Sequence, residues 1–100
     1  MNPRIKKVKP NSNYTITLIF TNEEIKVFDV KPYLDKGIFK ELKELRYFNS
    51  VKPSLGSVQW ENGQDFCPDM LYEESIPWDK ALNSGFVSVQ PELEPDLVTV

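Results

Sequence analysis

The fold class is decided by two neighbouring stretches of the chain, Tyr14-Thr15-Ile16-Thr17-Leu18-Ile19-Phe20 and Ile25-Lys26-Val27-Phe28-Asp29-Val30. In the first stretch, large apolar side chains alternate with threonines, which is typical of a strand that has one face on a core. The turn between the stretches is so short that the two strands must run antiparallel. Residues 4–9 mix basic and apolar side chains and predict an opening strand beside them.

A helical pattern follows these strands. Ile38, Phe39, Leu42 and Leu45 are spaced to share one face of a helix, and charged residues occupy the positions between them. A helix of this length is marginal by itself in water, so packing on the sheet must stabilise it. We therefore predict an α+β fold, in which a small antiparallel sheet of hairpins packs against one main helix.

The dipeptide Asn62-Gly63 is the strongest local turn signal in the chain. Both residue types tolerate positive φ, which the two central positions of a type I′ turn require. The dipeptide therefore predicts a two-residue hairpin. That register would place Trp60 directly opposite Asp65 on the returning strand.

A short second helix is predicted after this hairpin. Pro68 suits a first helical position, and Asp69 follows in the first turn, where the helix dipole favours a negative charge. Asp65 precedes this helix, so its carboxylate is placed to accept a hydrogen bond from the indole of Trp60 or from backbone N–H groups at the helix start. We interpret the cluster as architectural, because it would join the hairpin to the helix.

The composition excludes much enzyme chemistry. The 100 residues include no histidine and one cysteine, which rules out an intramolecular disulfide, a Cys/His zinc site and any histidine-dependent triad. With no histidine to activate it, Cys67 is interpreted as a small apolar residue that fills the junction before Pro68. Asp65, Asp69 and Glu73 recur every four residues, but no calcium-loop pattern accompanies them. We expect no catalytic residue, no cofactor and no metal site.

Charge is divided between the two parts of the chain. Residues 1–60 hold eleven lysines and arginines against six acids, whereas residues 61–100 hold one lysine against nine acids. The candidate nucleic-acid surface is the basic cluster Arg4, Lys6, Lys7 and Lys9. The pI near 4.9 argues against a dedicated nucleic-acid-binding protein, whose domain usually has a pI above about 9.

One domain and one extension account for the whole chain. We expect residues 1–76 to form a single α+β domain and residues 77–100 to form an acidic C-terminal extension that is partly mobile. No run approaches the ~20 apolar residues of a membrane helix, and the first residues lack an apolar signal segment. We therefore expect a cytoplasmic protein that does not enter a membrane. An exposed edge strand in so small a sheet would allow a homodimer.

A family resemblance lies between Phe48 and Glu73. The spacing is Trp-x-Asn-Gly-x-Asp-x-x-Pro-Asp-x-Leu-Tyr-Glu, which starts at Trp60. With this motif the chain resembles the bacterial domain of unknown function 2442 family (DUF2442), over about residues 4–75. The resemblance implies a small α+β fold and no established enzymatic activity. It also implies a partner, because members are often encoded beside a protein of the domain of unknown function 4160 family, in pairs that look like toxin–antitoxin modules.

The chain departs from this family at the first hairpin. Members commonly carry Asp-Gly there, whereas this chain has Asn22-Glu23. Glutamate resists positive φ, so we expect a longer turn or a turn of another type at this position.

Three functions compete. We favour a small protein-binding or regulatory module, the antitoxin-like member of a two-gene pair. The first alternative is a nucleic-acid-associated regulator that uses the basic cluster, and the second is a metal-dependent enzyme built on the carboxylates of Asp65 and Asp69. The residues expected in a structural motif or interface are Trp60, Asn62, Gly63, Asp65, Pro68, Asp69, Leu71 and Tyr72.

Overall fold

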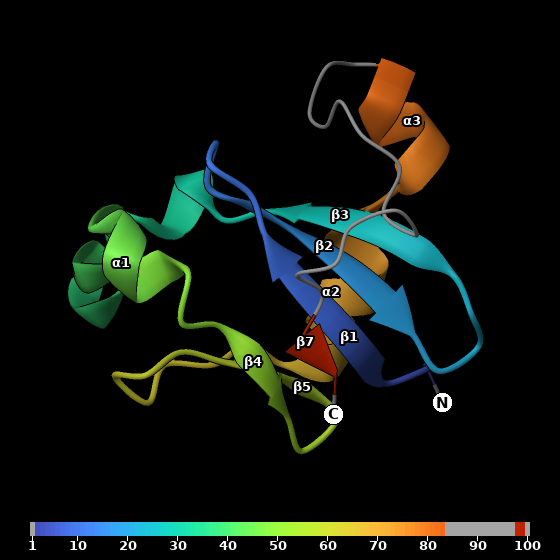
Figure 1. Cartoon of the computed structure of the whole chain (residues 1–100), viewed down its shortest axis with the longest axis horizontal. Coiled ribbons are helices and arrows are strands. Elements are labelled where there is room, and N and C mark those ends of the chain that lie inside the picture. The colour runs from blue at the N-terminus through green and yellow to red at the C-terminus, as the bar shows by residue number, and fades with distance from the viewer. Residues whose placement is uncertain (1, 84–97, 100) are drawn as a thin grey trace.

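A five-stranded antiparallel sheet is the centre of the computed structural model, which describes residues 2–83 and 98–99. The strand order is β6-β3-β2-β1-β7 (Figure 1). The α+β class and the antiparallel pairing of the two opening stretches are confirmed. The strands are β1 (Ile5–Pro10), β2 (Thr15–Phe20), β3 (Ile25–Asp29), β6 (Ile76–Pro77) and β7 (Val98–Thr99).

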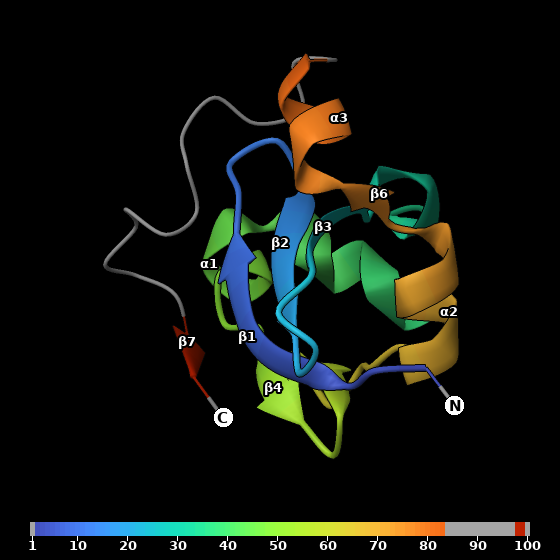
Figure 2. The same ribbon diagram turned by 90° about the vertical axis from the view of Figure 1, so that its right-hand side faces the viewer.

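A second hairpin and short helices surround this sheet. The hairpin pairs β4 (Lys52–Ser54) with β5 (Ser57–Gln59). In Figure 1, α2 lies behind the central strands, and Figure 2 shows α3 at the opposite end of the molecule from β4. The helices are the α-helices α1 (Leu45–Phe48), α2 (Pro68–Glu74) and α3 (Trp78–Asn83), and the 3-10 helices η1 (Lys31–Tyr33) and η2 (Gly37–Lys43).

The alternation along β2 decides where the cores form. Ile16, Leu18 and Phe20 are fully buried in the main core, on the face that the alternation predicts. On the opposite face, a smaller cluster joins Val27 of β3 to Ala81 of α3. The sheet is therefore covered on parts of both faces.

Three hairpin loops share one geometry. The loops are residues 12–14, 21–23 and 61–63. In each, the residue before the loop donates its N–H to the carbonyl of the residue after it, and the third loop residue donates back to the residue before the loop. That third residue is left-handed in all three, with φ of 64° at Tyr14, 74° at Glu23 and 89° at Gly63. This is the pattern of a type I turn closed by a left-handed residue.

An asparagine occupies the second position of each loop. Its side-chain oxygen accepts a hydrogen bond from the residue that follows the loop. The bonds are Thr15 Oγ1 to Asn13 (2.6 Å), Glu24 N–H to Asn22 (3.0 Å) and Gln64 N–H to Asn62 (3.0 Å). The loop at Asn22-Glu23 is longer than two residues, as the departure from the family pattern predicts, although Glu23 does adopt positive φ.

The single main helix expected from the apolar stripe is replaced by two short pieces. The backbone of Glu44 is extended (φ −76°, ψ 114°) and separates η2 from α1. Side chains three residues apart align in a 3-10 helix, so Phe39 and Leu42 still share a side, and Leu42 is fully buried. The break turns Leu45 out of the stripe and leaves it 41% exposed. The short second helix expected after Asn62-Gly63 is confirmed as α2.

The two-residue turn predicted at Asn62-Gly63 is wrong. Only Gly63 of the pair has positive φ, so the loop has three residues and pairs Asp65 with Gln59 instead of Trp60. A register shift of one residue exchanges the faces of a strand, and Phe66 is accordingly buried in the main core.

The fold continues beyond residue 76. β6 pairs with β3, α3 packs on β3 through Ala81, and β7 pairs with Lys7 and Val8 of β1. The partial mobility expected for residues 77–100 is not tested, because residues 84–97 and 100 lie outside the described residues. Within the part of the chain that is described, no helix has the length and apolar character needed to cross a lipid bilayer.

Candidate functional site

Trp60 and Leu71 of the motif are core residues. Trp60 is 1% exposed, as expected for it, and its indole Nε1 donates a 2.9 Å hydrogen bond to the carbonyl oxygen of Phe48 at the end of α1. The ring of Phe66 meets the indole edge to face, with centroids 5.6 Å apart. Leu71 brings α2 into the same cluster. These two residues therefore hold the loop region, α1 and α2 together.

Asn62 and Gly63 shape the loop between Trp60 and Gln64. Besides its bond within the loop, Asn62 donates through Nδ2 to Glu41 Oε1 at 2.7 Å, which ties the loop to η2. Gly63 supplies the left-handed residue, and a Cβ at this position would meet nothing within 4 Å. The requirement at Gly63 is therefore for backbone conformation and not for space.

The Asp65 carboxylate was predicted to accept a hydrogen bond from the Trp60 indole or from backbone N–H groups at the start of α2. It accepts neither, so that prediction is wrong. Asp65 is exposed, the indole of Trp60 donates to Phe48 instead, and no side-chain hydrogen bond caps α2. The reason is the register shift, which pairs Asp65 with Gln59. The hairpin and the segment that enters α2 are joined instead by Ser57, whose buried hydroxyl donates to the carbonyl oxygen of Phe66.

The start of α2 agrees with expectation at Pro68 and Asp69 and differs at Cys67. Pro68 opens the helix and Asp69 lies exposed in its first turn, as predicted. Cys67 is exposed, so its interpretation as a buried filler is wrong; as the residue before the helix it has an extended backbone (φ −66°, ψ 129°). Among residues 2–83 and 98–99, no three acidic or cysteine side chains come together to hold a metal ion.

Tyr72 connects α2 to the end of the loop before β3. Its hydroxyl donates to Glu24 Oε1 at 2.5 Å. The Nζ of Lys26 lies 4.1 Å from the centroid of the Tyr72 ring. The hydrogen bond from Tyr72, with a second from Asn22, holds the pKa of Glu24 below its ordinary value. The same bond, with burial as a lesser cause, raises the pKa of the Tyr72 hydroxyl.

The basic cluster is spread over different parts of the surface. Lys6 forms an ion pair with Glu23 at 3.1 Å, and Lys9 donates to Asn11 Oδ1 at 3.3 Å. Arg4 lies over the β4–β5 turn, where its Cδ would be 3.0 Å from a Cβ built on Gly56. Arg4, Lys6 and Lys9 are neighbours in sequence, but their side chains contact different parts of the structure, and Lys7 pairs through its backbone with Ile19 and Thr99.

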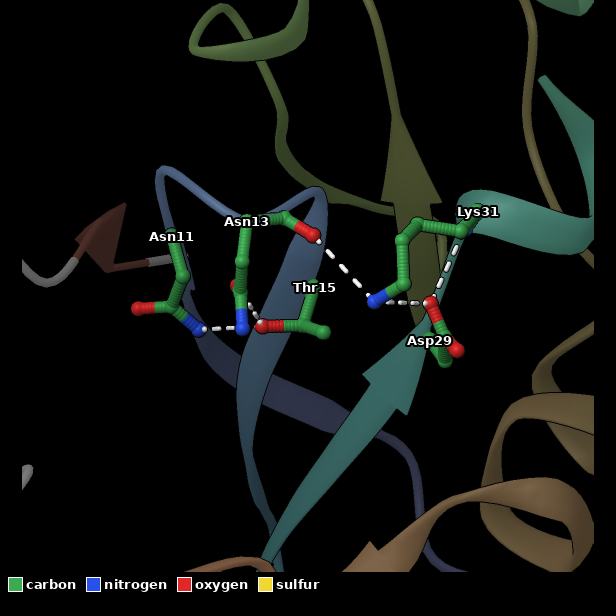
Figure 3. Close-up of polar contacts among 5 residues, drawn as sticks. All are labelled: Asn11, Asn13, Thr15, Asp29 and Lys31. Atoms are coloured by element: carbon green, nitrogen blue, oxygen red, sulfur yellow. Dashed lines mark hydrogen bonds and ion pairs between the residues drawn. The ribbon is translucent and has the colours of Figure 1, made fainter. Parts of the chain in front are cut away.

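A polar network closes the end of the sheet where β2 begins and β3 ends (Figure 3). Asn11 Nδ2 donates to Thr15 Oγ1 at 3.1 Å, and Thr15 in turn donates to Asn13. Lys31 donates to the carbonyl of Asn13 at 3.3 Å and pairs with Asp29 at 3.1 Å. These groups satisfy one another across three strands, so the network is best understood as scaffolding for the 12–14 loop.

The tip of the β4–β5 hairpin carries the most exposed apolar side chain described. Leu55 and Gly56 are the two central residues of a turn with φ of 50° and 82°, and Ser54 pairs with Ser57 across it. Positive φ at both positions defines a type I′ turn. The Leu55 side chain is 100% exposed. The sequence interpretation overlooked this residue, although Leu-Gly between two short strands is itself a signal for such a turn.

These elements define a small α+β domain with a rigid core motif and an apolar hairpin tip. The chain belongs to the family described as protein of unknown function (DUF2442), whose model matches residues 5–77. The match covers the chain from β1 through β6 and includes the Trp60-to-Glu73 motif, so the resemblance is confirmed. No curated protein and no solved structure matches the chain.

Proposed function

We propose that this chain is a protein-binding or regulatory module and not an enzyme. The observation that carries the proposal is Leu55, a large apolar side chain that is entirely in water at the end of a hairpin. Burial of such a side chain against a second protein is favoured by the hydrophobic effect, whereas in the free domain it contributes no packing. The other exposed large apolar side chains in the described residues are Leu45 and Tyr47 on α1, at 41% and 38%.

Within this class, we propose a bacterial, cytoplasmic antitoxin-like protein that binds a small partner encoded by an adjacent gene. The chain belongs to the DUF2442 family, and this supports the proposal, because the resemblance described above implies a partner of the domain of unknown function 4160 family. In this proposal the regulated activity belongs to the partner, and this chain supplies a folded binding surface.

Co-expression with the product of the adjacent gene tests the proposal. With an affinity tag on the adjacent product only, this chain should co-purify and the two should elute as one peak from a size-exclusion column. Two separate peaks, with this chain at its monomer mass or as a homodimer, would contradict the proposed partner.

The two alternatives have less support. A protein that binds nucleic acid needs a continuous basic surface along the phosphates. In this structure Lys6 is paired with Glu23, and Arg4 lies at the β4–β5 turn. For a carboxylate enzyme, Asp65 and Asp69 are both exposed, and in the residues described neither belongs to a group of three possible ligands.

A further inference from the structure

The β4–β5 turn is held rigidly against β1. The N–H of Ile5 donates to the carbonyl oxygen of Gly56 at 3.0 Å, and the aliphatic part of Arg4 covers the same glycine. A Cβ at Gly56 would lie 3.0 Å from Arg4 Cδ, so glycine is required for this contact as well as for its φ of 82°. The backbone of the turn that carries Leu55 is therefore anchored to β1 in the free domain, which reduces the entropy lost on binding.

Leu55 is unfavourable at its position in the free domain. The first central residue of a type I′ turn has positive φ, where asparagine, aspartate and glycine are preferred and a leucine is strained. The side chain gains no burial in return, because it is fully exposed. Neither the backbone nor the core of this domain explains a leucine there. A strained residue that the fold does not use points to a role outside the fold.

The segment that carries Leu55, together with Arg4 beside Gly56, holds cations and no acid. Residues 50–60 contain no acid and one cation, Lys52. Across residues 2–83 and 98–99, the guanidinium of Arg4 makes no ion pair, in contrast to Lys6 farther along β1. A fully exposed leucine beside an arginine that makes no ion pair within the described residues is complementary to an apolar pocket with carboxylates around it.

We propose that Leu55 and Arg4 form one contact for a partner protein, in which Leu55 enters an apolar pocket and Arg4 pairs with carboxylates on the rim of that pocket. The inference rests on the proposed function and adds the site and the chemistry of the partner surface. Arg4 suits the second role because its planar guanidinium matches a carboxylate in a bidentate pair.

Binding to the purified product of the adjacent gene, measured by calorimetry at low and high salt, tests the contact. Leu55→Asn should weaken binding about tenfold or more, since a buried leucine contributes that much or more. Arg4→Gln should weaken binding several-fold at low salt and reduce its salt dependence. The matched control is Leu45→Gln, which removes an exposed leucine from an ordinary helical backbone and should leave the affinity unchanged.

Thermal unfolding of the free variants supplies a second readout. Leu55→Asn should raise the Tm, because asparagine tolerates the left-handed conformation, and a lowered Tm would show that Leu55 serves the fold and would overturn the inference. If the wild-type chain binds the adjacent product and Leu55→Asn binds equally well, the inference fails while the proposed function stands. If the wild-type chain does not bind that product, the proposed function and this inference both fail.

Discussion

The indole nitrogen of Trp60 donates a hydrogen bond to the carbonyl oxygen of Phe48, 2.9 Å away and inside the main core. The same carbonyl accepts a longer bond, 3.4 Å, from the N–H of Val51. Carbonyl groups at the end of a helix have no partner within the helix, and a buried one must find a donor elsewhere. Trp60 therefore both fills the core and satisfies the end of α1.

Trp60→Phe should lower the free energy of unfolding by about 2–4 kcal/mol, because it leaves a cavity and removes the better donor to a buried carbonyl. Urea denaturation followed by circular dichroism measures the change. The control is Trp78→Phe, since the buried Nε1 of Trp78 has no hydrogen-bond acceptor among the described residues. Losses of equal size in the two variants would contradict the role given to the Trp60 hydrogen bond.

Glu23→Gly should raise the free energy of unfolding by about 0.5–1 kcal/mol. The left-handed conformation costs a residue with a Cβ about 1–2 kcal/mol, and glycine removes this cost. Glycine also loses more conformational entropy on folding, which offsets part of the stabilisation. Loss of the exposed ion pair to Lys6 subtracts little. The change in urea midpoint measures the gain, and a fall in stability would show that the ion pair outweighs the backbone strain.

Gly63→Ala is the opposite substitution: it adds a Cβ to the left-handed third residue of the 61–63 loop, the position that Glu23 occupies in the 21–23 loop. No atom lies within 4 Å of the added Cβ, so backbone strain alone should lower the free energy of unfolding, by about 1 kcal/mol. The same urea titration applies, and an unchanged midpoint would refute the shared geometry of the two loops.

Tyr72→Phe should destabilise the protein most near neutral pH. The Tyr72 hydrogen bond holds the pKa of Glu24 below its ordinary 4.5, so this stabilisation is present above pH 4.5 and is lost as the pH falls through the lowered pKa. The same bond raises the pKa of Tyr72 above its ordinary 10.0, so its stabilisation is present below pH 10.0 and is lost as the pH rises. Urea midpoints of wild type and variant should therefore converge at both pH extremes.

Glu24→Gln provides the check from the other side of this hydrogen bond. It should reproduce the convergence at low pH, because the wild-type carboxylate is then protonated as well. A difference between wild type and Tyr72→Phe that stays constant from acid to alkaline pH would show that the ring contacts matter and the hydrogen bond does not.

The strands and the buried motif could be predicted from the sequence because their signals are local. Alternation along residues 14–20 shows which face of the strand carries the main apolar core, and Pro68 marks the start of α2. Trp60 could be assigned to the core from its size and context alone. Each of these conclusions depends on the residue itself and on its near neighbours.

The error at the Asn62-Gly63 hairpin has a different origin, which is competition between two local turn geometries that differ by one residue. Asn62-Gly63 suits a two-residue turn, but the chain uses asparagine second and a left-handed residue third, as it does at Tyr14 and Glu23. The choice buries Phe66 in the core, a gain that no turn preference can reveal. Leu55 was missed for another reason: Leu-Gly signals the turn, but the turn signal does not show that the leucine side chain is left fully exposed.

Ser57→Ala should lower the free energy of unfolding by about 1–3 kcal/mol, whereas Asp65→Ala should change it by less than about 0.5 kcal/mol. The Ser57 hydroxyl is buried and donates to the carbonyl of Phe66, so its removal leaves a buried acceptor without that donor. Asp65 is exposed and pairs with Gln59 through its backbone, which alanine retains. Urea denaturation of both variants decides the matter. The opposite order would restore the architectural role that the sequence alone assigns to Asp65, and would require the carboxylate to reach the start of α2 in solution.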